Sequence, residues 1–398
     1  MRLLIINDYL VKGGAEMQSI REKEIFERYG NDVMLLTFDN KYNEGEILHN
    51  KSKGFYNIPI TENYKNKIYL RYKINKGLLN KINNIIDGFN PDVIHANNLN
   101  IAPLTQYMSL AGYKVVQTIR DYNFVCPAGT CIYNNDKVCS GIKHNNCLLK
   151  CGVSNLKVNE KFIRYKMLEK LRKNIVSQFI CPSEKLTEYC NRHEFNTICI
   201  NNPFDFKKFD KFIKNIDVDN KKYLYYGSIS KIKGVYNLID AFNIFSLNKN
   251  VELYIIGKIE CDINELKRRI NNNSKIKLLD QMDYSDIIKF LEEVYAIVVP
   301  SLWMENYPNT VLEGLATKTL VLGSNRGGIP DMLDNERGIV FDVLDDSSIV
   351  NSLNKSYSLT SDKYNDIVNN AYEYVNINNS VDTYYKRVRD IFNKLIKK

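Results

Sequence analysis

The sequence lacks several features that would place the protein in a membrane, outside the cell or on nucleic acid. No apolar run reaches the roughly 18 residues that a transmembrane helix needs. The first ten residues hold one Arg and a short apolar segment without a small-residue cleavage site, so we expect a first strand there, not a signal peptide. Basic residues are not gathered with aromatic residues around one groove, which disfavours a nucleic-acid partner. We therefore expect a cytoplasmic protein whose thiols are reduced outside one cysteine cluster.

The composition is typical of a soluble globular protein with more than one domain. The chain has 398 residues, of which 44% are hydrophobic and 25% are charged. A length well above about 150 residues predicts two domains or slightly more. The net charge of +9 is spread over most of the chain, so it favours an anionic surface or ligand without choosing between them.

Apolar runs typical of strands alternate with helical patterns along the whole chain. This alternation predicts an α/β architecture, in which helices cover both faces of a parallel sheet. The pattern restarts after Asn201, so we expect two doubly wound, Rossmann-like domains. The expected strands are Leu3–Ile6, Val33–Phe38, Val93–His95, Val115–Ile119, Phe179–Cys181, Tyr223–Tyr226, Val251–Ile256, Ile276–Leu278, Tyr295–Val299, Thr319–Leu322 and Ile339–Phe341.

A turn-forming segment, Asn201–Asp205, separates the two halves. We predict an N-terminal domain at 1–202, a C-terminal domain at 203–378, and an amphipathic helix at 379–398 that packs back across both. Ligands of open α/β sheets bind beyond the carboxyl ends of the strands. We therefore expect the site in the cleft where the loops of the two sheets face each other.

The stretch PSLWMENYPNTVLE at 300–313 joins an expected strand to an expected helix. Pro308 suits the first helical position, and the helix after it then offers free backbone amides, beginning at Asn309, to an anion. Glu305 precedes this helix and Glu313 lies within it. Two carboxylates placed in this way suit two separate hydroxyl-bearing parts of one phosphorylated ligand. The alternative is that the strand, the proline and the helix have a purely structural role.

Candidate residues also follow expected strands in the first half. The turn at 12–16 is glycine-rich and either admits a ligand close to the backbone or is a plain tight turn. His95 closes one strand and is either functional or a satisfied polar group. Arg120 and Asp121 close another strand, and an arginine can bind phosphate or carboxylate through two hydrogen bonds. All three side chains are expected to point toward the cleft.

A similar turn in the second half, at 226–234, joins a strand to a helix and brings Lys233 near the helix start. There Lys233 would add a full positive charge to the expected anion site. An exposed loop lysine without such a role is the alternative.

The inserted loop at 126–151 is rich in cysteine. Its thiols could hold a structural zinc or a cluster, form disulfides or remain free, because the spacing is not that of a zinc ribbon. The candidate metal ligands are Cys126, Cys139, Cys147 and Cys151.

Two segments, 64–89 and 157–173, combine basic residues with a helical apolar pattern. They could lie on the anionic inner face of the cell membrane as peripheral contacts. The alternative is a solvated charged face above a buried apolar stripe.

Taken together, these residues resemble the retaining glycosyltransferases of family 4, which have the two-domain GT-B fold. The resemblance covers nearly the whole chain, and the cysteine-bearing loop is similar to that of a subset that builds bacterial surface polysaccharides. The stretch ENYPNTVLE at 305–313 is similar to the E-x7-E motif of the family. The other matching segments are GGAE at 13–16, DVIHANN at 92–98, TIRDYNFVCP at 118–127, PSE at 182–184, NNPFD at 201–205 and GSISKIKG at 227–234.

The resemblance implies transfer of a hexose or N-acetylhexosamine from a nucleotide-diphosphate sugar, expected to be UDP-linked, to a glycan or polyprenyl-linked acceptor. Glu313 would bind the ribose, Glu305 the transferred sugar and Lys233 the leaving phosphate. No Asp-x-Asp-like motif lies near the cleft residues, so no catalytic metal is expected. The implied catalytic residues are Glu305, Lys233 and Arg120; the donor-binding residues are Gly14, Ser228, Lys233, Glu305, Asn306, Tyr307, Asn309, Thr310 and Glu313; and the acceptor-side residues are Glu16, His95 and Asp121.

Two positions depart from the family pattern. Ser228 stands where the family usually has an arginine, and Arg120 stands where relatives commonly have a histidine. Either Lys231, Arg326 or Arg120 supplies the missing charge, or the enzyme is slow, selective for an unusual donor, or inactive. The second hypothesis is therefore a non-catalytic carbohydrate- or nucleotide-binding subunit that has kept the fold, and turnover of the donor discriminates between the two.

Overall fold

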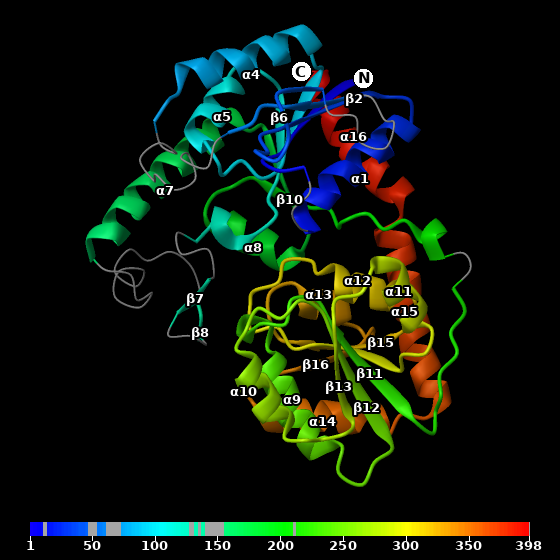
Figure 1. The fold of residues 1–398 in the computed structure, drawn as a ribbon. Helices are drawn as coiled ribbons and strands as arrows, with labels where there is room; N and C mark the ends of the chain where they lie inside the picture. The colour runs from blue at the N-terminus through cyan, green and yellow to red at the C-terminus, as the bar shows by residue number, and fades with distance from the viewer. Residues whose placement is uncertain are drawn as a thin grey trace. The chain divides into compact units, whose positions relative to one another are not determined.

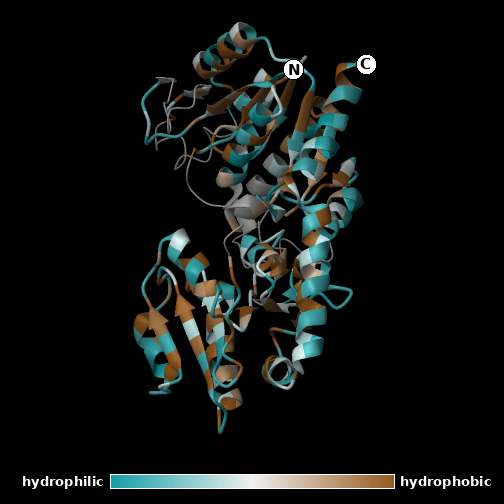
Figure 2. Cartoon of the chain, turned by 90° about the vertical axis from the view of Figure 1, so that its right-hand side faces the viewer, coloured by the Kyte–Doolittle hydropathy of each residue, from teal (hydrophilic) through white to brown (hydrophobic). Residues whose placement is uncertain are grey.

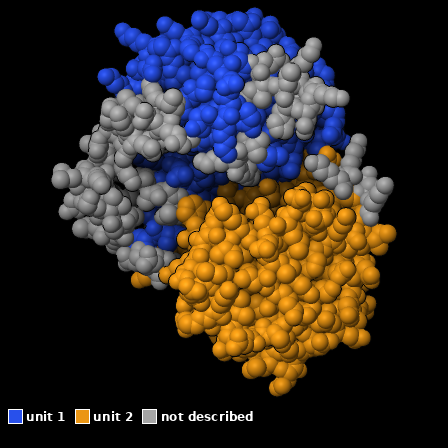
Figure 3. Space-filling view, viewed as in Figure 1, with its two compact units in different colours: residues 1–134, 139–202, 381–398 blue, residues 135–138, 203–380 orange. Residues whose placement is uncertain are grey.

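The computed structural model describes residues 1–10, 14–46, 54–60, 73–126, 131–133, 137–139, 155–209 and 212–397. The chain divides into two compact units, coloured separately in Figure 3. Unit 1 comprises residues 1–134, 139–202 and 381–398, and unit 2 comprises residues 135–138 and 203–380. The main division falls between Asn202 and Pro203, and the C-terminal helix, expected to pack across both domains, belongs to unit 1.

The core of unit 1 is an eight-stranded sheet with the strand order β10-β9-β6-β5-β1-β2-β4-β3. Neighbouring strands are parallel except for β3, which pairs antiparallel with β4. The strands are β1 (Arg2–Ile6), β2 (Asp32–Thr37), β3 (Gly45–Glu46), β4 (Phe55–Asn57), β5 (Val93–Ala96), β6 (Val115–Thr118), β9 (Gln178–Cys181) and β10 (Thr197–Cys199), and the short β7 (Ile132–Tyr133) and β8 (Lys137–Val138) lie outside the sheet.

The helices of unit 1 are α1 (Gly14–Arg28), α4 (Lys76–Phe89), α5 (Pro103–Ser109), α7 (Asn155–Ile175), α8 (Glu184–Arg192) and α16 (Val381–Ile396). The last helix packs beside the first, as Figure 1 shows, because aromatic residues meet between them. The ring of Phe26 lies 5.1 Å from that of Tyr385 and 5.5 Å from that of Phe392. The chain therefore returns to unit 1 at its C-terminal end.

Helix α4 decides one of the alternatives left open for the segment 64–89. It begins at Lys76, because the side chain of Asn75 accepts a hydrogen bond from the amide of Leu78 at 3.0 Å and caps the helix. Its apolar residues Leu78, Ile82, Ile86 and Phe89 are buried in the protein. Over 76–89 the segment is thus a charged face above a buried stripe, and residues 61–72 lie outside the described part of the chain.

Unit 2 has a six-stranded, fully parallel sheet with the strand order β13-β12-β11-β14-β15-β16. Its strands are β11 (Lys221–Tyr226), β12 (Val251–Ile256), β13 (Ile276–Leu279), β14 (Ala296–Val299), β15 (Leu320–Ser324) and β16 (Ile339–Phe341). Its helices are α9 (Val235–Phe245), α10 (Ile263–Ile270), α11 (Tyr284–Leu291), α12 (Asn309–Ala316), α13 (Ile329–Leu333), α14 (Asp346–Tyr357) and α15 (Ser361–Asn378).

Strand β14 shows why this sheet forms. All four of its residues are apolar and buried. Successive side chains of a strand point to opposite faces, so Ala296 and Val298 join the core on one face, while Ile297 and Val299 join the core on the other. A strand covered on both faces is apolar throughout, and Figure 2 shows brown strands beside helices that are brown on only part of their surface.

The α/β fold class and each of the expected strands are confirmed, with ends shifted by a few residues. Strands β3, β4 and β10 were not expected, because two or three residues are too few to show a period. Within the residues that the structure describes, no helix is both long enough and apolar enough to span a bilayer.

Candidate active site

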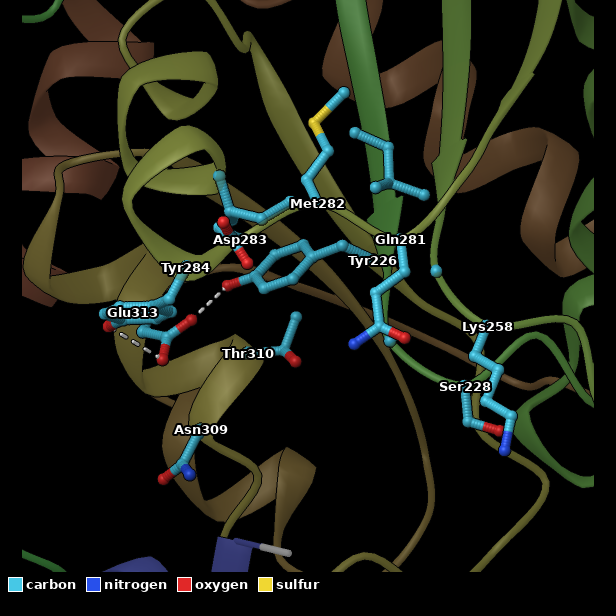
Figure 4. Close-up of a pocket in the computed structure, with 14 residues that line it drawn as sticks. Tyr226, Ser228, Lys258, Gln281, Met282, Asp283, Tyr284, Asn309, Thr310 and Glu313 are labelled. Carbon is cyan, nitrogen blue, oxygen red and sulfur yellow. Dashed lines mark hydrogen bonds between the residues drawn. The ribbon is translucent and has the colours of Figure 1, made fainter.

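Unit 2 contains a pocket at the carboxyl ends of strands β11 and β12, bordered by the start of α12 (Figure 4). Its volume is about 550 Å³. In a parallel sheet this is the edge where ligands bind. The lining residues are Tyr226, Gly227, Ser228, Ile256, Gly257, Lys258, Gln281, Met282, Asp283, Tyr284, Ile287, Asn309, Thr310 and Glu313.

Backbone contacts between two loops fix one side of the pocket. Gly257 has a φ of +151°, and a Cβ atom there would lie 1.8 Å from the carbonyl oxygen of Gly227. Only glycine fits this close approach. Beyond it, the amide of Ile229 donates to the carbonyl of Lys258 at 2.9 Å, and the amide of Glu260 donates to the carbonyl of Ile229 at 2.9 Å. The loops that follow β11 and β12 are therefore held together.

The carboxylate of Glu313 is the central acidic group of the pocket and is 8% exposed. The hydroxyl of Tyr226 donates to its Oε2 at 2.5 Å, and the hydroxyl of Tyr284 donates to its Oε1 at 3.1 Å. Burial and the nearby carboxylate raise the pKa of Tyr226 well above its ordinary value, so this hydroxyl stays protonated as a donor. Sequence reasoning missed both tyrosines, since neither lies in the E-x7-E stretch.

The N-terminus of α12 borders the same pocket through Asn309 and Thr310. Pro308 was expected at the first helical position, but with φ −68° and ψ 130° it is the residue before the helix. The carbonyl of Pro308 still accepts a hydrogen bond from the amide of Leu312, and the N-cap position makes no side-chain hydrogen bond to the helix. The positive end of the helix therefore faces a pocket that can accept an anion.

Glu305 and Lys233 form an ion pair in the loops of unit 2. The ammonium of Lys233 lies 2.6 Å from Glu305 Oε1, and Ser301 Oγ donates to the same oxygen at 2.9 Å. The backbone of Glu305 is also fixed, because a Cβ atom at Gly327 would lie 1.8 Å from its carbonyl oxygen. The amide of Gly328 donates to that oxygen at 2.7 Å. The structure thus brings together the two residues to which sequence analysis gave the leaving phosphate and the transferred sugar.

The loop between these two glutamates uses its residues in different ways. Tyr307 was expected to meet the donor through the backbone amide of its loop, and its side chain is 6% exposed with its hydroxyl 3.1 Å from Asn379 Oδ1. This side chain therefore belongs to the core of unit 2, and only its backbone could meet a ligand. Asn306 is partly exposed and is not among the described residues that line the pocket.

Ser228 lines the pocket, and its hydroxyl donates to Oε2 of Glu260. Of the cations expected to replace the arginine at this position, Lys231 is exposed in the short turn η3 (Lys231–Lys233), and Arg326 is only 5% exposed. Neither is among the described residues that line the pocket. Arg120 belongs to unit 1.

His95 was expected to close a strand and point toward a ligand, and this expectation is wrong for its side chain. It is fully buried in β5 of unit 1. Its Nδ1 contacts the buried carboxylate of Glu22, and its Nε2 lies 2.8 Å from Thr118 Oγ1. The alternative, a satisfied polar group, describes His95, because neighbouring side chains occupy both ring nitrogens.

Arg120 and Asp121 do lie beyond the end of β6. The guanidinium of Arg120 donates from Nε to Asn97 Oδ1 at 2.9 Å and from Nη1 to Asn202 Oδ1 at 2.8 Å. Both residues line a small cavity of about 10 Å³ in unit 1, and burial raises the pKa of the Asp121 carboxyl. Such a cavity holds about one water molecule, so as it stands it accepts no sugar.

The remaining candidates of unit 1 are only partly described. Gly14 is the first residue of α1, and Glu16 in its first turn is 8% exposed. Of the four candidate metal ligands, Cys147 and Cys151 lie outside the described residues. The amide of Cys131 instead donates to the sulfur of Cys126 at 3.4 Å. Among the described residues, no group of three or more His, Cys, Asp or Glu side chains could hold a metal ion.

Residues 206–374 match the family model described as glycosyl transferases group 1. Unit 2 contains a group 1 glycosyltransferase domain. The matched range includes the pocket of this glycosyltransferase domain as well as Lys233 and Glu305. The sequence prediction of a glycosyltransferase is thereby confirmed at the level of the group, whereas family 4 and retention of configuration stay predictions.

Two curated bacterial proteins resemble the chain. An uncharacterized 42.6 kDa protein in the cps region of Klebsiella pneumoniae is 24% identical over 358 residues, which are 83% of this chain and 87% of the relative. The capsular polysaccharide biosynthesis glycosyltransferase CapM of Staphylococcus aureus is 26% identical over 197 residues, 47% of this chain and 50% of the relative.

Solved structures show that the fold of the chain is that of GT-B glycosyltransferases, as predicted. Sucrose-phosphate synthase from Thermosynechococcus elongatus matches with a TM-score of 0.74 and 14% identity, over 100% of this chain and 99% of the synthase. The Anabaena protein HepE in complex with UDP-glucose matches with a TM-score of 0.70 and 15% identity, over 99% of this chain and 100% of HepE. At such identities the likeness establishes the fold alone.

Proposed function

We propose that the protein is a retaining glycosyltransferase of family 4 that moves a hexose or N-acetylhexosamine from a UDP-linked sugar to a glycan or polyprenyl-linked acceptor. The observation that carries the proposal is the pocket of unit 2, where the Glu313 carboxylate and the start of α12 meet within a group 1 glycosyltransferase domain. The UDP-glucose bound to HepE supports the donor, and the name of CapM supports a role in surface polysaccharide synthesis.

The pocket suits a nucleoside diphosphate. Each oxygen of the Glu313 carboxylate can accept more than one hydrogen bond, so it can hold ribose hydroxyls beside the hydroxyls of Tyr226 and Tyr284. The amides at Asn309 and Thr310 start α12 and would meet the diphosphate at the positive end of the helix. Nucleoside and phosphate would thus bind on opposite parts of one pocket wall.

The proposed chemistry follows the movement of charge. The anomeric C–O bond to the diphosphate breaks and its electron pair leaves with the phosphate oxygen. The acceptor hydroxyl oxygen forms the new bond on the same face of the sugar, and its proton passes to the departing phosphate oxygen. The ammonium of Lys233 stabilises the negative charge that develops on the departing phosphate oxygen. Glu305, whose Oε1 lies 2.6 Å from this ammonium, orients the Lys233 side chain and binds hydroxyls of the transferred sugar.

Unit 1 is proposed to hold the acceptor. Arg120, held by two amide side chains, and Asp121 lie beyond the carboxyl end of the parallel strand β6, where an α/β sheet presents binding residues. We also propose that the enzyme acts at the inner face of the cell membrane.

A panel of nucleotide sugars in a thermal-shift assay tests the donor class directly. A ligand at 100 times its dissociation constant stabilises the folded state by roughly 2.7 kcal/mol. We expect stabilisation by UDP and by at least one UDP-linked sugar, and release of UDP from that sugar when an acceptor is added. A panel in which no nucleotide changes the melting temperature would contradict the proposal.

Measuring UDP release by the Lys233→Ala variant tests the catalytic assignment. Removing one preorganised group that stabilises developing negative charge costs about 10²–10³ in kcat, so UDP release should fall by this factor. Lys267→Ala is the matched control, because Lys267 is exposed on α10 and is not among the described residues that line the pocket. Tight donor binding without hydrolysis or transfer in the wild-type protein would favour the non-catalytic binding subunit instead.

A further inference from the structure

The pocket of unit 2 raises the question of which cation meets the diphosphate, because position 228 carries a serine. Among the described residues that line the pocket, Lys258 is the one lysine or arginine. The lining also includes the carboxylates of Asp283 and Glu313, so without Lys258 its side chains would carry only negative charge. A diphosphate entering such a pocket needs a compensating cation.

The backbone places position 258 beside position 228. Strands β11 and β12 are parallel and in register, with Tyr226 opposite Ile256. The pairing continues beyond the strands, since Ile229 forms a parallel bridge with Ile259 and its amide donates to the carbonyl of Lys258 at 2.9 Å. Residues 228 and 258 therefore begin equivalent loops on neighbouring strands, and a cation on either loop can reach the same space.

The side chains of both residues approach one carboxylate. The ammonium of Lys258 lies 3.7 Å from Glu260 Oε1, and the Ser228 hydroxyl donates to Glu260 Oε2. Figure 4 shows the Lys258 side chain ending beside Ser228 at the edge of the pocket. The side chain of Lys258 is 72% exposed and its contact with Glu260 is long, so its flexible stem is free to follow a bound anion.

We propose that Lys258 is a donor-binding residue that meets the diphosphate of the nucleotide sugar in place of an arginine at position 228. The inference rests on the proposed function, because it assigns a residue to the same donor. Glu260 accepts a hydrogen bond from the Ser228 hydroxyl and lies within 3.7 Å of the Lys258 ammonium, and its negative charge opposes the phosphate. Among the described lining residues, the positive charge is thus supplied by Lys258 in the loop after β12, whereas Ser228 in the loop after β11 supplies none.

Titration calorimetry with UDP and with uridine tests this assignment, since the two ligands differ only in the diphosphate. We expect Lys258→Ala to weaken UDP binding about tenfold and to leave uridine binding unchanged, and Lys258→Arg to restore UDP affinity. Glu260→Gln should tighten UDP binding, because it removes a like charge and releases Lys258. Lys267→Ala, an exposed lysine outside the described lining, is the matched control and should bind UDP as the wild type does.

A double variant makes the test specific to charge position. Ser228→Arg combined with Lys258→Ala should recover most of the lost UDP affinity, whereas a merely structural role of Lys258 would not be rescued from position 228. The inference fails if Lys258→Ala binds UDP within about twofold of wild type, or if UDP and uridine weaken equally. If the wild-type protein binds no UDP, the proposed function itself fails; if it binds UDP and Lys258→Ala binds it within about twofold of wild type, only this inference fails.

Discussion

Each unit holds a carboxylate with little exposed surface, and the surroundings of the two differ. In unit 1, Glu22 is fully buried against the imidazole of His95, which in turn lies 2.8 Å from Thr118 Oγ1. In unit 2, Glu313 is 8% exposed and accepts hydrogen bonds from two tyrosines that line a pocket of about 550 Å³. Both carboxylates have hydrogen-bonding partners, but only the second borders open space.

The comparison shows that burial and polar partners do not by themselves mark a ligand site. A buried acidic group with a basic partner can serve the fold alone, because leaving either partner unpaired is costly. The same kind of group beside a cavity keeps acceptor capacity for a ligand. We therefore expect substitutions at Glu22 to change stability and substitutions around Glu313 to change nucleotide affinity.

The largest effect is expected for Glu22→Ala. This change leaves Nδ1 of the buried His95 imidazole without its hydrogen-bonding partner and should lower the free energy of unfolding by up to about 3 kcal/mol. Urea unfolding measures the loss, and UDP titration below the unfolding transition should give the wild-type affinity. Glu24→Ala on the same helix is the control, because Glu24 is exposed and should stay within about 0.5 kcal/mol of wild type. A Glu22→Ala protein that is as stable as the wild type but has lost UDP binding would contradict the assignment of Glu22 to stability alone.

A smaller effect, on binding instead of folding, is expected for Tyr226→Phe. The variant removes the hydroxyl that donates to Glu313 Oε2 at 2.5 Å and should weaken UDP binding by about tenfold, since hydrogen bonds to charged groups contribute about 1.5–3 kcal/mol. The loss should be smaller for 2′-deoxy-UDP, which offers Glu313 one hydroxyl fewer. Tyr254→Phe is the matched control, because its hydroxyl donates to Glu252 at 2.8 Å outside the described lining of the pocket. Equal losses of affinity for UDP and 2′-deoxy-UDP would show that the Tyr226 hydroxyl does not act through ribose binding.

The sequence predicted the parts of this picture that are local along the chain. Strands such as β14 are apolar throughout, and the stretch from Pro308 into α12 holds the proline, the free amides and Glu313 within a few residues. The partners of these residues come from strand register. Tyr226 and Lys258 reach the pocket from different strands, and no local pattern links them to Glu313. His95 shows the opposite error, because a place near a strand end does not reveal that its side chain is enclosed by α1 and β6.

The smallest effect concerns Lys214 of unit 2, whose hydrogen-bonding partners among the described residues are neutral groups. The ammonium of Lys214 donates to the carbonyl of Leu291 at 2.7 Å and to Thr319 Oγ1 at 2.6 Å, both neutral groups. Burial lowers the pKa of Lys214 to about 7, and the more distant charge of Glu292 offsets only part of this.

Because the folded pKa lies below the value of 10.5 expected in the unfolded chain, the unfolded state binds more protons between about pH 7 and pH 10. The free energy of unfolding should therefore rise with pH across this window, relative to Lys214→Met, and run parallel to that variant below pH 6. The slope cannot exceed about 1.4 kcal/mol per pH unit, and the partial exposure of Lys214 should keep it well below this limit. Urea unfolding of both proteins from pH 5.5 to pH 9 measures the difference. Profiles that stay parallel up to pH 9 would mean that Lys214 keeps its proton although its hydrogen-bonding partners are neutral groups.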